Sequence, residues 1–171
     1  MTAFHFCFDL DHFGLIAQDF HHDPFWTWQR SAIVSLFLFT AGLSQAVALH
    51  QGQGWARFWR RWAQVAGAAL LVSAGSALMF PKTFIYFGVL HGIAVMLVVV
   101  RLTAGWGAWL WPLGALAVAA KFIAPLAIAA VPVLEILNTP GPNVLGFVSR
   151  LPVTEDYVPL LPWLGVMLFG L

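Results

Sequence analysis

The hydrophobic residues of this chain lie in long uninterrupted runs rather than at every second or third position. Four runs hold 18 or 19 residues without a charged side chain, at 31–49, 62–80, 83–100 and 102–120. A helix rises about 1.5 Å per residue and the hydrocarbon core of a bilayer is about 30 Å thick, so each run is long enough to cross it. The pattern predicts an all-α fold, a polytopic transmembrane helical bundle.

Composition narrows the class of protein further. Hydrophobic residues make up 61% of the chain and charged residues only 9%, whereas charged residues make up about 25% of a typical soluble domain. The chain is therefore not an ordinary soluble domain. Its one cysteine, Cys7, excludes an internal disulfide framework.

The placement of the charges predicts the orientation of the spans. Lysine and arginine collect on the cytoplasmic side of a membrane protein. The segment 50–61 carries three arginines and no acidic residue, so we expect it in the cytoplasm. Alternating spans then place 9–30 and 135–158 outside, and all seven acidic residues fall in these two segments.

The apolar stretch 105–134 is interrupted by Lys121, Pro125 and Pro132. Proline removes a helix donor and clashes with the preceding turn, so a kinked or broken helix is expected here. Two interpretations remain open. The broken helix lines a cavity, or Lys121 marks the end of a span near the membrane surface.

Both ends of the chain have the character of partial spans. Eight residues precede Asp9, and they cover only about 12 Å as a helix. The last 15 residues, from Tyr157, are apolar and end without a flanking charge. We therefore expect about six spans in a single domain, residues 1–171, with the first and last spans partial.

His91 is an ionisable residue about halfway along the run 83–100. Such a group is costly in the membrane and usually faces a cavity or a partner. Gly88 and Gly92 flank it and would allow another helix or a ligand to approach closely. The alternative is a neutral histidine that is hydrogen-bonded to a neighbouring helix.

His5 and Asp9 are four residues apart, so they share one face of a helix. A carboxylate beside an imidazole fixes the tautomer of the ring and raises its basicity, which is what a general base requires. Such a spacing is common by chance, so it does not by itself establish a catalytic pair.

Three further histidines, His12, His21 and His22, lie in the predicted external segment with Asp19 and Asp23. Imidazole and carboxylate groups suit zinc. The spacing nevertheless matches no closed ligand set, and no second cysteine is present. We therefore expect a solvated polar loop and no bound metal.

Several short motifs occur in a characteristic order. They are HFCFDLDHFG, DPFW, SLFLFTAGLSQAVAL, FWRRWAQV, IYFGVLHGIAV, NVLGF and DYVPLLPWLGVMLFG. This order resembles the catalytic domain of the heparan-alpha-glucosaminide N-acetyltransferase family, within the wider group of transmembrane acyltransferases. The resemblance covers most of the chain. The chain lacks the Arg-Gly motif that normally precedes the first span of the family, and several later spans of the family are missing.

The resemblance implies a multi-span enzyme of the membrane, which we expect to be the bacterial inner membrane. Such an enzyme takes an acyl group from cytosolic acyl-CoA, typically acetyl-CoA, and needs no metal. The acceptor, on the outer side, is a sugar amine or hydroxyl, free or in a glycan. The implied partners are thus the lipid bilayer and a small-molecule or glycan acceptor, with no nucleic acid and with self-association into a homo-oligomer open.

The resemblance also implies roles for individual residues. His5, in the HFCFDL motif, is the best match to the catalytic histidine, with Asp9 as its orienting partner. His91 occupies the FGxLH position and is the third catalytic candidate. Asp156 and Tyr157 belong to the late motif and are expected to bind substrate.

Two further groups complete the predicted site. Arg57, Arg60 and Arg61 are expected to meet the phosphates of CoA, because arginine forks suit phosphate; the alternative is that they serve topology alone. His21 and His22 are expected to bind substrate, and in a gapped alignment either one takes the place of His5 as the catalytic histidine.

Two other functions remain open. In a transporter, His91 and the broken helix 105–134 would line a substrate path. In a non-catalytic membrane scaffold, none of these residues would do chemistry. Replacement of His5 distinguishes the acyltransferase from these two functions. In an acyltransferase it should abolish turnover but leave acyl-CoA binding intact.

Overall fold

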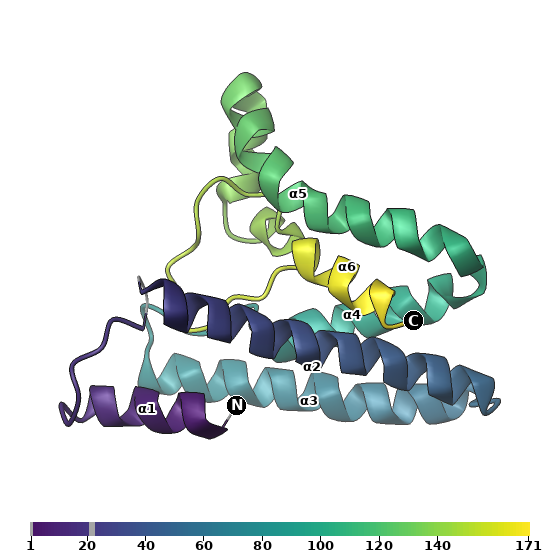
Figure 1. Cartoon of the computed structure of the whole chain (residues 1–171), viewed down its shortest axis with the longest axis horizontal. Helices are drawn as coiled ribbons and strands as arrows, with labels where there is room; N and C mark the ends of the chain where they lie inside the picture. Colours follow the sequence, from purple (N-terminus) through teal and green to yellow (C-terminus); the bar gives the residue numbers. More distant parts are fainter. Residues whose placement is uncertain (1, 21–22) are drawn as a thin grey trace. The chain divides into compact units, whose positions relative to one another are not determined.

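The computed structural model describes residues 2–20 and 23–171. These residues form six α-helices and three short 3-10 helices, with no β-strand among them, which confirms the predicted all-α fold. The elements are α1 (Thr2–His12), α2 (Pro24–His50), α3 (Trp55–Met79), α4 (Val89–Thr103), η1 (Ala104–Trp109), α5 (Leu110–Ala130), η2 (Pro132–Asn138), η3 (Pro142–Leu145) and α6 (Leu160–Phe169) (Figure 1).

The chain divides into two compact units, residues 1–37 and residues 38–171. The first unit contains α1, the loop after it and the beginning of α2. The second contains the rest of α2 together with α3 to α6. The predicted functional residues are divided in the same way, with His5 and Asp9 in the first unit and His91 in the second.

Among the described residues, three helical stretches are long and apolar enough to cross a membrane: Pro24–His50, Trp55–Met79 and Val89–Ala130. The third is not one continuous α-helix, because the chain turns at η1, where Gly107 has a φ of 55°. Most of the side chains in these stretches are not buried within the chain. Apolar side chains left uncovered in this way suit contact with lipid hydrocarbon, as expected for a membrane bundle.

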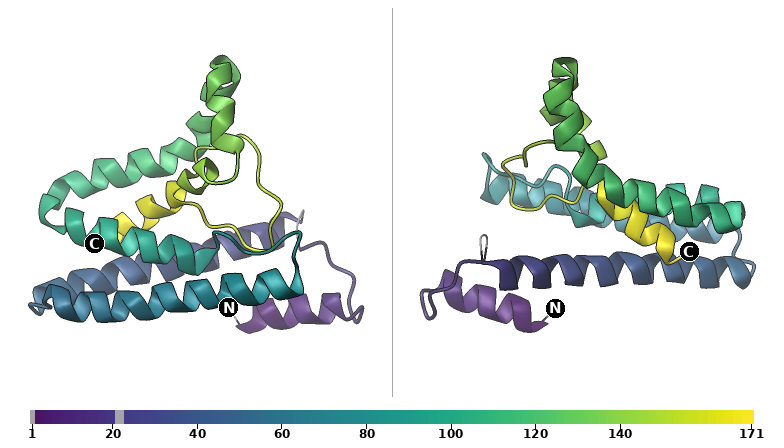
Figure 2. Two further views of the ribbon diagram at one scale, coloured as in Figure 1. Left: turned by 180° about the vertical axis from the view of Figure 1, so that it is seen from behind. Right: turned by 45° about the horizontal axis from the view of Figure 1, so that its top comes forward.

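The predicted interruption of the stretch 105–134 is confirmed. Helix α5 contains Pro125 and ends at Ala130, and Pro132 begins η2. Figure 2 shows α5 bending in its second half, the half that contains Pro125. A proline inside a helix causes such a bend, because its ring clashes with the carbonyl of the preceding turn. Lys121 is exposed on this helix.

In the first unit, aromatic rings hold α1 against the loop and the start of α2. The Phe20 ring, which is buried, lies 5.6 Å from the Phe4 ring and 4.2 Å from the Trp26 ring, measured between centroids. Helix α2 begins beside Asp23, whose carboxylate accepts a hydrogen bond of 2.8 Å from the Phe25 N–H. A side-chain acceptor of this kind stabilises the first turn of a helix.

In the second unit, α6 packs against both α5 and the later half of α2 at glycines. A Cβ on Gly165 of α6 would collide with the carbonyl oxygen of Gly114 on α5. A Cβ on Gly42 of α2 would collide with the carbonyl oxygen of Met167 on α6. Small residues allow helix backbones to approach this closely in membrane proteins.

The residues just before α4 are extended rather than helical, and they pair with the segment that precedes α6. The Glu155 N–H donates to the Thr83 carbonyl at 2.9 Å, and the Val158 N–H donates to the Phe87 carbonyl at 3.3 Å. The predicted span 83–100 is therefore wrong at its start, since the helix begins only at Val89. Pairing with a segment about 70 residues away along the chain prevents the earlier residues from joining the helix.

Candidate functional site

His91 lies in the first turn of α4, on the side that contacts α3. The prediction that it stands halfway along a span is wrong, because α4 starts only two residues earlier, at Val89. Its ring is half-buried and lies 6.0 Å from the Phe87 ring between centroids. The histidine therefore marks the junction between the extended segment 83–88 and helix α4.

Both ring nitrogens of His91 have hydrogen-bond partners. Nδ1 accepts from the Gly88 N–H at 3.3 Å, and Nε2 lies 3.0 Å from the Ser73 Oγ on α3. The Ser73 hydroxyl donates its own proton to the Ile85 carbonyl at 2.6 Å. Ser73 must then accept from His91, so the network assigns the neutral ring with its proton on Nε2.

This arrangement gives His91 a structural function at the start of its own helix. It stands at the third position of α4, where Glu or Gln in a capping box accepts a hydrogen bond from the N-cap N–H. His91 makes that bond to Gly88 and also links α4 to α3 through Ser73. The geometry agrees with the alternative of a neutral histidine bonded to a neighbouring helix, and it leaves neither ring nitrogen free to take a proton from a substrate.

Asp156 lies at the same helix end as His91. Its Oδ2 atom accepts a hydrogen bond of 2.7 Å from the Val89 N–H, the first backbone donor of α4. A carboxylate is favourable there because the N-terminus of a helix carries a partial positive charge. The space predicted around Gly88 is filled by this carboxylate, since a Cβ on Gly88 would collide with it.

Tyr157 joins a second set of polar contacts next to Asp156. Its hydroxyl donates to the Asn143 carbonyl at 2.6 Å, and the Asn143 side-chain amide donates to the Tyr86 hydroxyl at 2.7 Å. Burial raises the pKa of Tyr157 well above its usual value, and the neighbouring Tyr86 adds to the shift. The hydroxyl therefore stays protonated and remains a donor, which ties the loop before α6 to η3.

His5 and Asp9 both lie on α1, in the first unit, and their spacing places them on one face of that helix. Both side chains are exposed. Among the residues that the structure describes, no hydrogen bond joins the His5 ring to the Asp9 carboxylate. The two predicted residues therefore lie near each other as separate, exposed side chains on α1.

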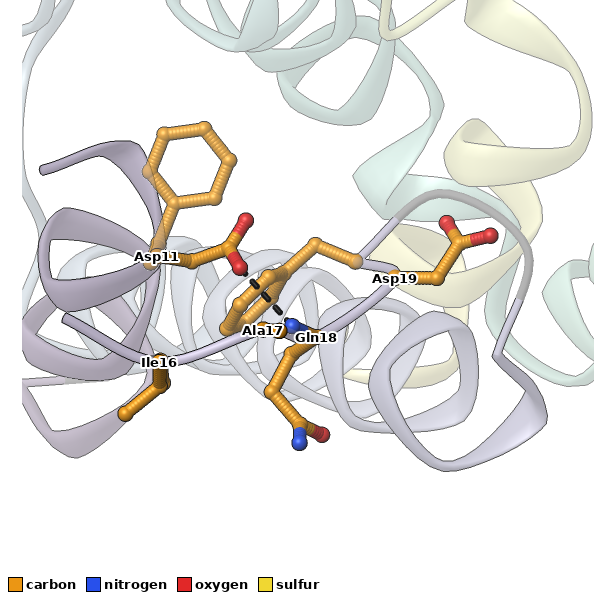
Figure 3. Close-up of a pocket in the computed structure, with 7 residues that line it drawn as sticks. Asp11, Ile16, Ala17, Gln18 and Asp19 are labelled. Carbon is orange, nitrogen blue, oxygen red and sulfur yellow. Dashed lines mark hydrogen bonds between the residues drawn. The ribbon is translucent and has the colours of Figure 1, made fainter. Parts of the chain in front are cut away.

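A hollow of about 660 Å³ lies in the same unit, between the second half of α1 and the loop that follows it, and neither His5 nor Asp9 lines it. Figure 3 shows its lining, with Asp11 and Asp19 on opposite sides and the Gln18 N–H bonded to the Asp11 carboxylate at 2.8 Å. Phe20 also lines the hollow. His21 and His22, which were expected to bind substrate, lie outside the described residues.

The three predicted phosphate-binding arginines are exposed near the start of α3. Arg57 and Arg60 line a hollow of about 530 Å³ together with Gly52, Gly54 and Ala56. Ser73, the partner of His91, stands 13 residues after Arg60 on the same helix, which is about 20 Å along its axis. The arginines and His91 therefore lie toward opposite ends of α3.

A comparison with protein families matches the whole chain, residues 1–171, to the family described as heparan-alpha-glucosaminide N-acetyltransferase, catalytic. The chain belongs to this family. The match confirms the resemblance that the order of motifs indicated, and it makes the chain a membrane acyltransferase-like protein. No curated protein matches the chain, and no solved structure matches it.

In this member of the heparan-alpha-glucosaminide N-acetyltransferase family, the structure brings some of the predicted residues together and not others. His91, Asp156 and Tyr157 meet at the start of α4 and the loop before α6. His5 and Asp9 belong to the other unit. No group of three or more metal-binding side chains gathers in residues 2–20 and 23–171.

Sequence reasoning missed two residues of the site, Ser73 and Asn143, and it missed the burial of Arg101. Ser73 is a polar residue inside an apolar span, and that polarity was a readable signal. Asn143 stands in the NVLGF motif, which suggested the family but no role for its amide. Arg101 ends an apolar run and is buried, although a charged residue at the end of a span usually reaches toward water.

Proposed function

We propose that this protein transfers an acetyl or other short acyl group from acyl-CoA on the cytoplasmic side to an amine or hydroxyl acceptor on the opposite side. The observation that carries the proposal is the family match over all 171 residues. The apolar helices support it, since donor and acceptor on opposite faces require a protein that spans the bilayer.

The chemistry needs a base. The acceptor nitrogen or oxygen attacks the thioester carbonyl, the C–S bond breaks, CoA leaves as a thiolate that takes up a proton, and the acceptor loses a proton. We assign His5 as the base and Asp9 as the carboxylate that orients its ring. Their spacing on α1 and their exposure support this assignment, because catalytic hydrogen bonds often close only once substrate is bound.

His91 is assigned a positioning role. Its ring nitrogens bond to Gly88 and Ser73, so proton transfer by His91 would first break a contact that holds α4 in place. Asp156 and Tyr157 shape the substrate surface from the loop before α6. His21 and His22 are proposed to contact the acceptor, because they directly follow the loop that lines the hollow beside α1.

Arg57, Arg60 and Arg61 are proposed to bind the phosphates of the acyl-CoA donor. A guanidinium group binds phosphate oxygens through two parallel N–H donors and carries its charge at every accessible pH. The exposure of these side chains and the hollow beside two of them support this role. No acidic residue occurs anywhere between positions 24 and 134 to compete for them.

These assignments define a cellular setting. We propose that the protein lies in the bacterial inner membrane as a single functional domain. Its partners are the surrounding lipid, acyl-CoA as donor, and a sugar or glycan acceptor. A histidine base and arginine donors account for the chemistry without a metal ion.

The proposal is tested with the purified protein, radiolabelled acetyl-CoA and glucosamine, with chromatographic detection of N-acetylglucosamine. We expect label in the product only when the protein is present, and a large loss of product in His5→Ala. His50→Ala, an exposed histidine at the end of α2, is the matched control and should retain full activity. Absence of acylated product with every amine and hydroxyl acceptor tested would contradict the proposal, and acceptor flux without acylation would favour a transporter.

A further inference from the structure

Arg101, in the last turn of α4, is a buried cation that has no anionic partner in the part of the chain that the structure describes. Its side chain is only 7% exposed. One guanidinium nitrogen, Nη2, donates to the Gln53 carbonyl, while the other, Nη1, is buried and has no hydrogen-bond partner among the described residues. A buried charge is costly unless it is paired and hydrogen-bonded. Residues 24–134, which include all of α3 and α4, contain no carboxylate, and no ion pair of Arg101 is found within residues 2–20 and 23–171.

The guanidinium of Arg101 lies against the first turn of α3. Its central carbon is 5.2 Å from the Trp55 ring centroid and 5.5 Å from the Phe58 ring centroid. Gln53, to which it donates, stands between Gly52 and Gly54, and these two glycines line the 530 Å³ hollow. The buried charge therefore contacts the same loop that forms one wall of this hollow.

The first turn of α3 presents unpaired backbone donors and no capping side chain. Gly54 stands at the N-cap, so no side chain caps the helix, and the first backbone N–H groups of a helix have no partner within it. The aligned peptide dipoles of this 25-residue helix add partial positive charge at the same end. Arg101 covers Trp55 and Phe58 in this part of α3, and Arg57 and Arg60, from the first two turns, line the adjacent hollow.

We propose that Arg101, the first turn of α3, Arg57 and Arg60 form one phosphate-binding site that takes a phosphate ester. Resting on the proposed function, the ligand is a phosphate of the acyl-CoA donor. Binding would pair the unpartnered Nη1 of Arg101 and place the donor at the end of α3 opposite to His91. The phosphate of an anionic lipid headgroup has the same chemistry and is the other source to be tested.

The test uses the full chain in phosphatidylcholine nanodiscs, with calorimetric titration of CoA and of pantetheine, which lacks the phosphates. R101Q should weaken CoA binding by about tenfold or more, the effect of losing one charge-assisted hydrogen bond. R57Q/R60Q should weaken CoA binding to a similar extent, and the CoA affinity of R101K should lie between those of R101Q and the wild type. Pantetheine binding should not change, and Lys82→Gln, in the loop after α3, is the control and should bind CoA within twofold of the wild type.

The outcomes separate this site from the proposed function. If R101Q binds CoA as tightly as the wild type, the proposed phosphate site is overturned, but the assignment of acyl-CoA as the donor stands. If R101Q does not fold, the other variants provide the test. CoA affinity at the wild-type level in both R101K and R57Q/R60Q would also overturn the phosphate site. If the wild type binds no CoA, and phosphatidylglycerol raises its melting temperature but not that of R101Q, the site holds a lipid phosphate and the donor assignment fails. No response to either ligand would overturn the site.

Discussion

The carboxylate of Asp156 accepts a hydrogen bond of 2.7 Å from the backbone N–H of Val89, although 67 residues separate the two in the chain. This contact joins the loop before α6 to the first turn of α4. It also brings Asp156 close enough to His91 for a direct electrostatic interaction. The motifs FGVLH and DYVPLLPW are distant in the sequence, and this hydrogen bond joins them in the structure.

Substitutions of Asp156 should show how much its hydrogen bond to Val89 contributes to stability. Asp156→Ala removes the acceptor and should lower the free energy of unfolding by about 0.5–2 kcal/mol, the usual cost of a lost helix cap. Asp156→Asn keeps an acceptor oxygen and loses only the charge, so it should cost less. Chemical unfolding in detergent, followed by circular dichroism, gives both values. Equal stability of Asp156→Ala and the wild type would show that the contact does not cap α4.

Gly88 should tolerate no larger residue. A Cβ at this position would collide with the Asp156 carboxylate and would lie 2.7 Å from the Ile85 side chain. Gly88→Ala should therefore lower the melting temperature and displace Asp156 from α4. Gly75→Ala is the matched control on α3, because no atom lies within 4 Å of its added Cβ and alanine favours helix. A Gly88→Ala protein as stable as Gly75→Ala would contradict the packing described.

The loop that contains η2 should depend on pH through Glu135. Hydrogen bonds from Asn138 and Arg150, each 2.9 Å, hold the pKa of Glu135 below its usual value of 4.5. The unfolded chain then binds the proton more readily, so the contribution of Glu135 to stability is present above that value and is lost as the pH falls through the folded pKa.

Glu135→Gln provides the comparison for this effect. Between neutral pH and pH about 3, the wild type should lose more stability than Glu135→Gln, and the two should converge at the acid end. The difference should be small, because the pair is exposed to solvent. Melting curves recorded across this range test the prediction. Parallel pH profiles for the two proteins would show that the Glu135 contacts do not stabilise the fold.

The apolar runs predicted the helical fold well, because length and the absence of charge are properties of each segment alone. The sequence also contains a local signal for the start of α2 that counting charges does not use. Helix α2 begins at Pro24, before the uncharged run that starts at residue 31, and the Asp23–Pro24 pair is a helix-start signal. Arg30 lies inside this helix, so counting charges alone placed its start too late.

The site was less predictable because it depends on contacts between distant segments. Residues 83–88 were expected to be helical, but they pair with residues 155–158 instead. That pairing moves the start of α4 to Val89 and turns His91 from a mid-span residue into a helix cap. The burial of Arg101 also follows from packing, since Trp55 and Phe58 cover it from another helix.

The assignment of the base predicts the behaviour of three variants. His5→Ala should lower acyl transfer by about 10²–10⁴-fold, the usual contribution of a general base. Asp9→Asn should cost less, because the imidazole remains while its orientation is disturbed. Acyl-CoA binding, measured by calorimetry, should be unchanged in both. Normal turnover in His5→Ala combined with its loss in His21→Ala or His22→Ala would move the base to the loop after α1.

Acyl transfer across the bilayer is the central claim, and reconstitution into sealed proteoliposomes of one orientation tests it most directly. Labelled acetyl-CoA is supplied only on the side of Arg57 and Arg60, and glucosamine is trapped only on the other side. We predict labelled N-acetylglucosamine in the compartment with the acceptor and no loss of acetyl-CoA when the acceptor is omitted. Product that forms only when both substrates share one compartment, or glucosamine that crosses without being acetylated, would contradict this account.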